Sequence, residues 1–213
     1  MIIIMNINKK RQFIHEIHKA FPKTKAMVQF AEGEDALLFK KKNNVYRYTK
    51  TSSLEAAHRE MDICRIAAEN GLFPMLRMPT YDEDSKILEI KIENMDGTFY
   101  DLKNEIQRIG GGEAEMKYKQ LLNKLISKIK DLNNLGICHG DLNKNPNNIM
   151  YKGSLRDYKL YIIDFTTARE NVKGCTNLNL KSVYTFHRTQ ARTNQMKTPT
   201  TKGSLLDMFN RAA

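Results

Sequence analysis

Residues 139–150 read HGDLNKNPNNIM, a run in which one carboxylate, Asp141, stands among glycine, proline and several asparagines. Glycine and proline interrupt regular structure, so this run predicts a loop. A second carboxylate, Asp164, directly follows the apolar run Tyr158–Ile163, which predicts a strand. Phosphoryl transfer from a metal-bound nucleotide uses such a set, because one carboxylate orients the attacking hydroxyl while an amide and a second carboxylate hold Mg²⁺.

The clearest helical pattern of the chain lies just before this loop. Leucine and isoleucine recur on one face of the stretch Glu113–Asn134 and lysines on the other, so a long amphipathic helix is predicted there. Residues 148–151 and 158–163 predict a hairpin around a Lys-Gly-Ser turn. The helix would lead directly into the loop, and the hairpin would bring Asp164 back toward Asp141.

The N-terminal half shows short β-rich runs separated by polar turns, which predict an antiparallel sheet accompanied by helices. The predicted helices cover residues 6–20 and 52–71, and the predicted strands cover residues 26–30, 36–39, 45–48, 76–81 and 86–92. Beyond residue 170 the apolar signal fades, and one short terminal helix is predicted over residues 203–211.

The order HGDL and then Asp-Phe-Thr resembles the protein-kinase-like superfamily, whose catalytic loop reads H-R-D-L-x-x-x-N and is followed by D-F-G. The H-G-D form is similar to atypical and minimal kinases, including those of viruses and bacterial effectors. This resemblance implies that Asp141 is the catalytic carboxylate, Asp164 the main metal ligand and Asn148 the second ligand. The family's asparagine position is held here by Pro146, so two neighbours, Asn145 and Asn147, remain alternatives for that ligand.

The same resemblance implies how the nucleotide would be held. Gly33 is the only glycine in the turn that would cover the phosphates, where the family has G-x-G-x-x-G. Val45 would pack on adenine and Arg47, two residues later, would replace the family's strand lysine, with Lys50 as the alternative cation. Glu60, in Arg59-Glu60-Met61, would pair with that cation.

The resemblance also implies an α+β, bilobal protein-kinase-like fold. A small N-terminal lobe of antiparallel sheet plus one helix would cover residues 1–93, and a truncated, mostly helical C-terminal lobe would cover residues 94–213. Three residues of the linker, Glu93, Asn94 and Met95, would contact the adenine edge. The implied cofactors are ATP and Mg²⁺ or Mn²⁺.

The formal net charge of +11 and the pI of about 9.5 favour anionic partners or serve solubility alone. They fit an acidic protein substrate, whereas nucleic-acid binding through the segment Lys181–Lys202 is less favoured because it lacks an aromatic-rich recognition motif. An activating partner protein that completes the short C-terminal lobe remains open. The three cysteines lack metal-site spacing, and no long apolar run is present, so we expect no membrane segment and a cytoplasmic location, in the host if the source is viral or an effector.

These features together predict an ATP-dependent phosphotransferase, with a minimal serine/threonine protein kinase as the first choice. The segments Met95–Thr98 and Arg59–Met61 favour a protein acceptor because they look like protein kinases. Two alternatives remain: a small-molecule phosphotransferase, since H-G-D is common there, and a catalytically impaired kinase-like binding module, since the glycine loop is degenerate.

Overall fold

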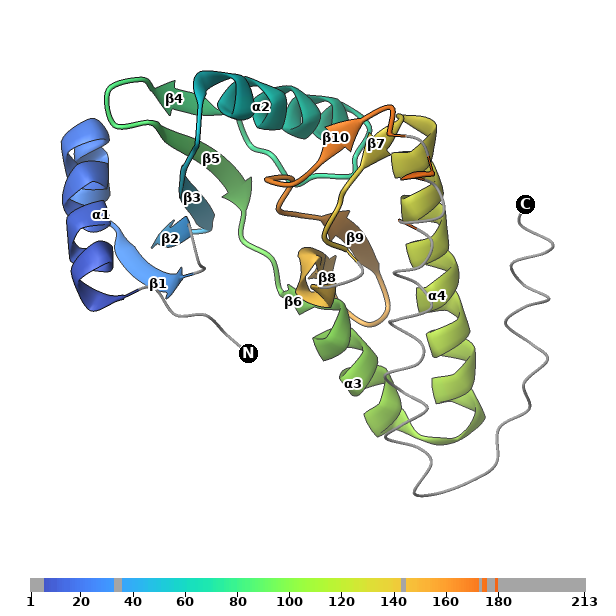
Figure 1. The fold of residues 1–213 in the computed structure, drawn as a ribbon. Coiled ribbons are helices and arrows are strands. Elements are labelled where there is room, and N and C mark those ends of the chain that lie inside the picture. Colours follow the sequence, from blue (N-terminus) through green and yellow to red (C-terminus); the bar gives the residue numbers. More distant parts are fainter. Residues whose placement is uncertain (1–5, 33–35, 143–144, 173, 176–178, 180–213) are drawn as a thin grey trace.

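The structure is a computed structural model, and it describes residues 6–32, 36–142, 145–172, 174–175 and 179 (Figure 1). The predicted terminal helix at 203–211 therefore lies outside the described residues. None of the helices in the described part of the chain has the length and apolar character that crossing a membrane requires.

The N-terminal half contains helices and the strands of one sheet, and the remainder contains two further helices and short strands. In chain order these are α1 (Ile7–Ala20), the 3-10 helix η1 (Pro22–Ala26), β1 (Val28–Glu32), β2 (Ala36–Lys41), β3 (Asn44–Lys50), α2 (Leu54–Glu69), β4 (Thr80–Asp82), β5 (Ile87–Glu93), β6 (Gly97–Thr98), α3 (Phe99–Ile109), α4 (Gly111–Asn134), β7 (Ile137–Cys138), the 3-10 helix η2 (Pro146–Asn148), β8 (Ile149–Gly153), β9 (Tyr158–Ile162) and β10 (Arg169–Glu170).

The N-terminal sheet is antiparallel throughout, in the order β1-β2-β3-β5-β4. The predicted strands 26–30, 36–39 and 45–48 are confirmed with shifted ends. The strand predicted at 76–81 is wrong in its bounds, because β4 begins only at Thr80. Pro79 has no N–H to donate to a ladder, and upstream only an isolated bridge joins Met75 to Ile92.

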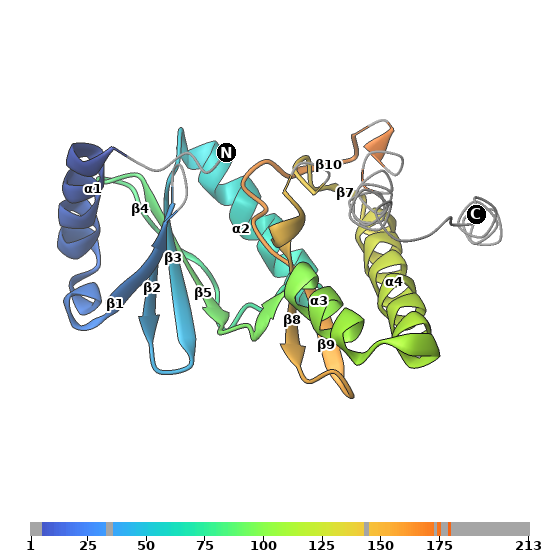
Figure 2. The ribbon, with the colours of Figure 1, turned by 90° about the horizontal axis from the view of Figure 1, so that it is seen from below.

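The two faces of this sheet pack on different helices, as Figure 2 shows. Helix α1 covers one face, where Phe13 and Ile17 contact a cluster that includes Tyr46 and Tyr48 of β3. The opposite face joins the larger core with α2, to which β3 contributes Val45. Successive side chains of a strand point to opposite faces, so β3 serves both cores at once.

Helix α2 begins at an N-cap, because the Ser53 side chain accepts a hydrogen bond from the Ala56 N–H. Its buried residues recur every three or four positions and form one stripe, which includes Glu60 among apolar neighbours. A helix over residues 52–71 was predicted and is confirmed. Because the stripe faces the sheet, Glu60 points to the same side of β3 as Val45.

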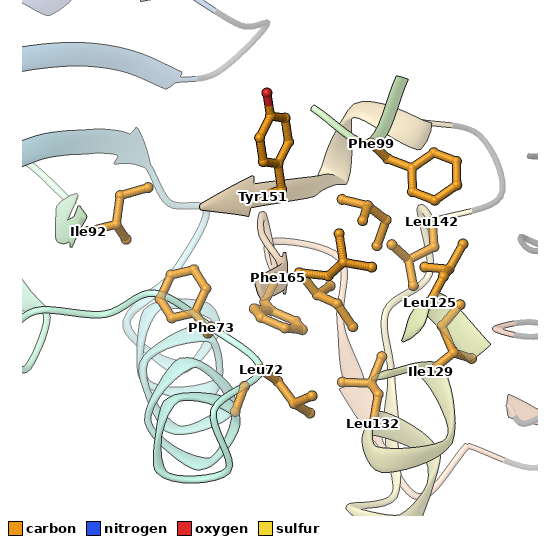
Figure 3. Packing of buried hydrophobic residues seen from close by; sticks show 14 of the residues in the cluster. Leu72, Phe73, Ile92, Phe99, Leu125, Ile129, Leu132, Leu142, Tyr151 and Phe165 are labelled. Atoms are coloured by element: carbon orange, nitrogen blue, oxygen red, sulfur yellow. The ribbon is translucent and has the colours of Figure 1, made fainter. Parts of the chain in front are cut away.

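Helix α4 contributes its buried leucines and isoleucines to the larger core, together with residues of α3, β8 and β9 (Figure 3). The predicted helix 113–134 is confirmed and begins two residues earlier, at Gly111. The predicted hairpin is present as β8 and β9, with β6 alongside β8. The larger core includes residues from both sides of residue 93, so the division at 93/94 stays a prediction.

Helix α3 is an element that the sequence interpretation missed. It begins at a capping box, in which the Thr98 side chain and the Asp101 side chain each bond the other's backbone N–H. Phe99, Leu102 and Ile106 are buried on one side of the helix. Both signals were present in the sequence, as a threonine three residues before an aspartate and as apolar residues at helical spacing.

Candidate active site

The Asp141 loop is tied to the Asp164 segment through one buried histidine. His139 is fully buried, and its Nε2 donates to the backbone carbonyl of Ile163 at 2.9 Å. Its ring packs on Phe165, with centroids 5.1 Å apart. Gly140 follows with φ of +81°, and a Cβ there would meet the carbonyl oxygen of Thr167 at 3.0 Å, so the close approach of the two segments needs a glycine.

Asp141 is paired with only one of the three candidate asparagines. The Asn148 amide nitrogen donates to Asp141 Oδ2 at 3.2 Å, and Asn148 is 3% exposed. Asn147 is exposed, and its backbone N–H donates instead to the side chain of Asn145 at 3.3 Å. The geometry therefore favours Asn148 over both alternatives as the partner of the catalytic loop.

Arg47 lies at the centre of a second group of side chains, which we call the Arg47 cluster: Arg47, Thr49, Glu60, Asp164 and Thr166. Arg47 Nη2 donates to Glu60 Oε1 and to Thr166 Oγ1, the latter at 3.0 Å. Arg47 Nη1 donates to Asp164 Oδ1 at 3.0 Å, and Nε donates to Thr49 Oγ1 at 2.9 Å. The cluster thus joins β3, α2 and the segment after β9.

Burial and charge set the ionisation of this cluster. Burial alone would lower the pKa of Arg47, but the carboxylates of Glu60 and Asp164 outweigh burial and raise the pKa above its ordinary value. Burial alone would raise the pKa of Asp164, but the charge of Arg47 and the hydrogen bond from Thr166 lower it below its ordinary value. Asp164 is therefore an anion at neutral pH. Its side chain is 43% exposed, which also favours the charged form.

Lys50, the alternative cation, lies outside the Arg47 cluster. Its ammonium group contacts Glu16 of α1 at 2.6 Å. Arg47 and Lys50 are three positions apart on β3, so their side chains leave the strand on opposite faces. Val45 lies on the Arg47 face and is buried in the larger core, whereas Gly33 lies outside the described residues.

The three linker residues differ in what their backbone groups can offer a ligand. The Glu93 N–H donates to the Pro74 carbonyl, and the Asn94 N–H donates to the Asn43 carbonyl, each at 3.0 Å. The Asn94 carbonyl accepts from Lys152 Nζ at 2.8 Å. Within the described part of the chain, Met95 makes no such backbone hydrogen bond, so it has the free backbone groups that an adenine edge needs.

Several polar residues of the site were missed by sequence reasoning. Thr49 lies two residues after Arg47 on the same strand face, which was a usable signal. Thr167 Oγ1 donates to the His139 carbonyl at 2.9 Å. Asn179, 2% exposed, accepts from the His139 N–H at 3.3 Å and donates to the Ile137 carbonyl at 2.9 Å. Asn179 comes from a stretch with few apolar residues, so no sequence pattern marked it.

Comparisons with known proteins bear on this arrangement. A family model described as the lipopolysaccharide kinase (Kdo/WaaP) family matches residues 82–200, which is more than half of the 213 residues. No curated protein sequence matches the chain. Among solved structures, the chain is similar to "WaaP in complex with acyl carrier protein" with a TM-score of 0.54 and 13% identity, covering 98% of this chain and 96% of that chain.

A second solved structure is the kinase PK-1 of the Cydia pomonella granulovirus, with a TM-score of 0.49 and 20% identity over 75% of this chain and 57% of that chain. The likeness to the WaaP structure confirms the predicted α+β, protein-kinase-like fold. The family model confirms the resemblance to the kinase-like superfamily, and the residues it matches include the loop and both carboxylates. The chain therefore belongs to the lipopolysaccharide kinase (Kdo/WaaP) family of kinase-like phosphotransferases.

Proposed function

We propose that the protein transfers the γ-phosphate of ATP, together with Mg²⁺ or Mn²⁺, to a hydroxyl group of an acceptor. One observation carries this proposal: the Asp141–Asn148 pair and the Asp164–Arg47–Glu60 group are linked through the same buried His139, which precedes Asp141 in the loop and bonds the Ile163 carbonyl next to Asp164. Phosphoryl transfer depends mostly on positioning and on neutralising charge, and these two groups supply both.

Asp141 is the proposed catalytic carboxylate. Its Oδ2 is held by Asn148, while no described residue donates a hydrogen bond to its other oxygen. That oxygen can accept a hydrogen bond from the acceptor hydroxyl, orient the hydroxyl for attack and take up its proton. The rigid helix α4 and the buried His139 hold the backbone on which Asp141 sits.

The donor atoms near Asp141 fit a magnesium or manganese ion shared with phosphates. The Asn148 amide nitrogen is used by Asp141, which leaves its carbonyl oxygen as a ligand. Both side-chain hydrogen bonds that described residues donate to Asp164 reach Oδ1, so Oδ2 has no side-chain donor among them and can act as a ligand. In the described part of the chain no group of three His, Cys, Asp or Glu side chains forms a complete site, so the phosphates would supply further ligands. A bound ion would neutralise charge on these phosphates.

Arg47 is the proposed phosphate-side cation, braced by Glu60. A guanidinium has five N–H donors, and four hydrogen bonds to protein groups use four of them. One Nη1 donor remains for a phosphate oxygen. Arg47 would therefore contribute one phosphate contact and the positive charge, while Met95 would contact the adenine edge through its backbone.

For the acceptor we propose a protein serine or threonine hydroxyl, supported by the kinase-like segments 59–61 and 95–98 and by the net charge of +11, which suits an acidic protein. A sugar hydroxyl is the second candidate. It is favoured by the family model, whose description names lipopolysaccharide. Both acceptors require the same Asp141 chemistry, so the catalytic residues do not distinguish them.

The test is transfer of labelled phosphate from [γ-³²P]ATP with Mg²⁺ or Mn²⁺. The purified protein is assayed alone, with a cell extract, and with lipopolysaccharide. The loss-of-function variant is Asp141→Ala, and Asp84→Ala is the matched control because it removes an exposed carboxylate from the turn before β5. We expect a loss of about 10²–10⁴-fold for Asp141→Ala and no change for Asp84→Ala.

Label on a protein band would support the serine/threonine proposal, and label on the lipopolysaccharide would support the second candidate. Label that persists with Asp141→Ala would remove Asp141 from the mechanism. If the wild type transfers no label and binds no metal–nucleotide complex by calorimetry, the protein is a kinase-like binding module and the proposed function is wrong.

A further inference from the structure

Thr166 occupies the position at which the D-F-G motif of related kinases carries glycine, and its hydroxyl makes contacts that a glycine cannot make. The hydroxyl lies 2.7 Å from Asp164 Oδ1, 3.0 Å from Arg47 Nη2 and 3.4 Å from Glu60 Oε1. A hydroxyl has one hydrogen to donate and can accept in addition. Because the distance to Asp164 Oδ1 is the shortest of the three, we assign the hydroxyl hydrogen to that bond. The hydroxyl oxygen then accepts the N–H of Arg47 Nη2.

These contacts explain the form of the Arg47–Asp164 ion pair. Arginine and carboxylate groups frequently pair through two parallel hydrogen bonds. Here only Arg47 Nη1 reaches Asp164, and it reaches Oδ1 alone. Arg47 Nη2, the second nitrogen of the fork, is directed instead to Glu60 and Thr166. The ion pair is therefore single, and Asp164 Oδ2 is left outside it.

The hydroxyl can hold this geometry because its backbone is anchored. Phe165, the preceding residue, is fully buried and contacts the ring of Phe73 (Figure 3). It also contacts the ring of His139. The Ala168 N–H closes a turn onto the Phe165 carbonyl at 2.9 Å. Asp164 itself has φ of +63°, a left-handed conformation that residues other than glycine seldom adopt. This backbone conformation sets the direction in which the Asp164 side chain leaves the chain.

Without the hydroxyl, Arg47 Nη2 loses one acceptor beside Asp164. We expect it to turn to the second oxygen of the same carboxylate, which would complete the two-bond pair. That pair would occupy both oxygens of Asp164. A metal ion would then have to break a charge-assisted hydrogen bond before it could bind.

We propose that Thr166 is a positioning residue that keeps the Arg47–Asp164 ion pair single and so leaves Asp164 Oδ2 open to the metal ion of the nucleotide complex. This inference rests on the proposed function, because it concerns the same metal ligand.

The experiment compares Thr166→Val, which keeps the shape and removes the hydroxyl, with Thr166→Ser, which keeps the hydroxyl. Mn²⁺ binding in the presence of ATP is followed by electron paramagnetic resonance of the free ion, and crystal structures of the metal-free variants are determined. We expect Mn²⁺ to bind at least about tenfold more weakly to Thr166→Val and within about threefold of wild type to Thr166→Ser. The structure of Thr166→Val is expected to show Arg47 on both oxygens of Asp164.

Thr166→Ala replaces Thr166→Val if the valine variant does not fold. Equal Mn²⁺ affinity in the wild type and the hydroxyl-free variant would overturn the role of Thr166 and leave the proposed function standing. Equal weakening in Thr166→Ser and Thr166→Val would also overturn it, because the hydroxyl would not be responsible. Absence of Mn²⁺–ATP binding in the wild type would instead overturn the proposed function, and this inference with it.

Discussion

The Arg47 cluster and the Asp141–Asn148 pair differ in how firmly the protein holds them. Arg47 is bonded by four side chains from three separate parts of the chain, and only 12% of its side chain is exposed. Among the described residues, Asp141 has a single side-chain hydrogen bond, from a residue seven positions away. The cluster is a fixed frame, whereas Asp141 keeps an oxygen for a ligand. Substitutions in the Arg47 cluster should therefore lower stability first, whereas substitutions around Asp141 should weaken ligand binding first.

The largest effect is expected on stability, when the Arg47 cluster loses the buried carboxylate of Glu60. Glu60→Ala leaves Arg47 with the half-exposed Asp164 as its remaining counter-charge among the described residues, and we expect the free energy of unfolding to fall by about 3 kcal/mol. Urea denaturation measures this free energy of unfolding. Asp62→Ala on the same helix, where Asp62 is largely exposed, should change stability by less than about 0.5 kcal/mol. Equal stability of the two variants would show that Glu60 does not support the frame.

The second effect should appear in binding rather than in stability. Asn148→Ala removes one proposed metal ligand and the side chain that bonds Asp141, so we expect the affinity for Mg²⁺–ATP to fall at least about tenfold. Calorimetric titration measures this affinity. Asn147→Ala is the matched control and should bind within about twofold of wild type, because Asn147 is exposed. A larger loss with Asn147→Ala would move the ligand to that residue.

His139 connects the two groups, and it should make stability depend on pH. Burial lowers the pKa of His139 below its ordinary value in the folded protein, while the unfolded chain has a pKa of about 6.5. Below about pH 6.5 the unfolded state takes up a proton that the folded state does not. Stability should therefore fall as the pH decreases, by at most about 1.4 kcal/mol per pH unit.

Urea denaturation between pH 7.5 and 6.0 measures this dependence. Burial also lowers the pKa of His18 in α1, so the series is repeated with His18→Gln to separate the two histidines. His58→Gln serves as the control, because His58 is exposed on α2. A flat stability profile in the His18→Gln protein would contradict the neutral, buried state of His139.

The smallest effect is expected at Lys50, the cation that lies outside the Arg47 cluster. Lys50 pairs with Glu16 at the protein surface, where the Lys50 side chain is 50% exposed. Lys50→Ala should lower the free energy of unfolding by less than about 0.5 kcal/mol and leave Mg²⁺–ATP affinity unchanged. Arg47→Ala, assayed beside it, should weaken that affinity. If Lys50→Ala weakened nucleotide binding instead, the choice of Arg47 as the phosphate-side cation would be wrong.

The sequence predicted best what depends on local pattern. Helix α4 was predictable because its apolar residues recur with the helical period over 24 residues. The loop with Asp141 and the strand before Asp164 were predictable because glycine, proline and an apolar run mark them. Helix α3 was missed although its capping box and apolar stripe are local signals.

Contacts between distant segments were predictable only through the family resemblance, or not at all. The pairing of Arg47 with Glu60 came from the order of motifs in related kinases. The contribution of Thr166 to the same guanidinium joins residues 119 positions apart, and the Asn179 contact to His139 spans 40 positions. Such contacts arise when separately folded elements pack together, so no local period encodes them.

Strand β3 lies between two cores, and its register carries a consequence for misfolding. Tyr46 and Tyr48 point into the apolar cluster beneath α1, whereas Val45 and Arg47 point to the opposite side, toward α2. A slip of one residue would exchange these faces. It would bury the guanidinium against Phe13 and Ile17 without a counter-charge and would place tyrosine rings beside Glu60. Helix α1 thus disfavours the shifted register, because its apolar side chains would have to pack against the charge of Arg47. The register that is left places Arg47 in the active site.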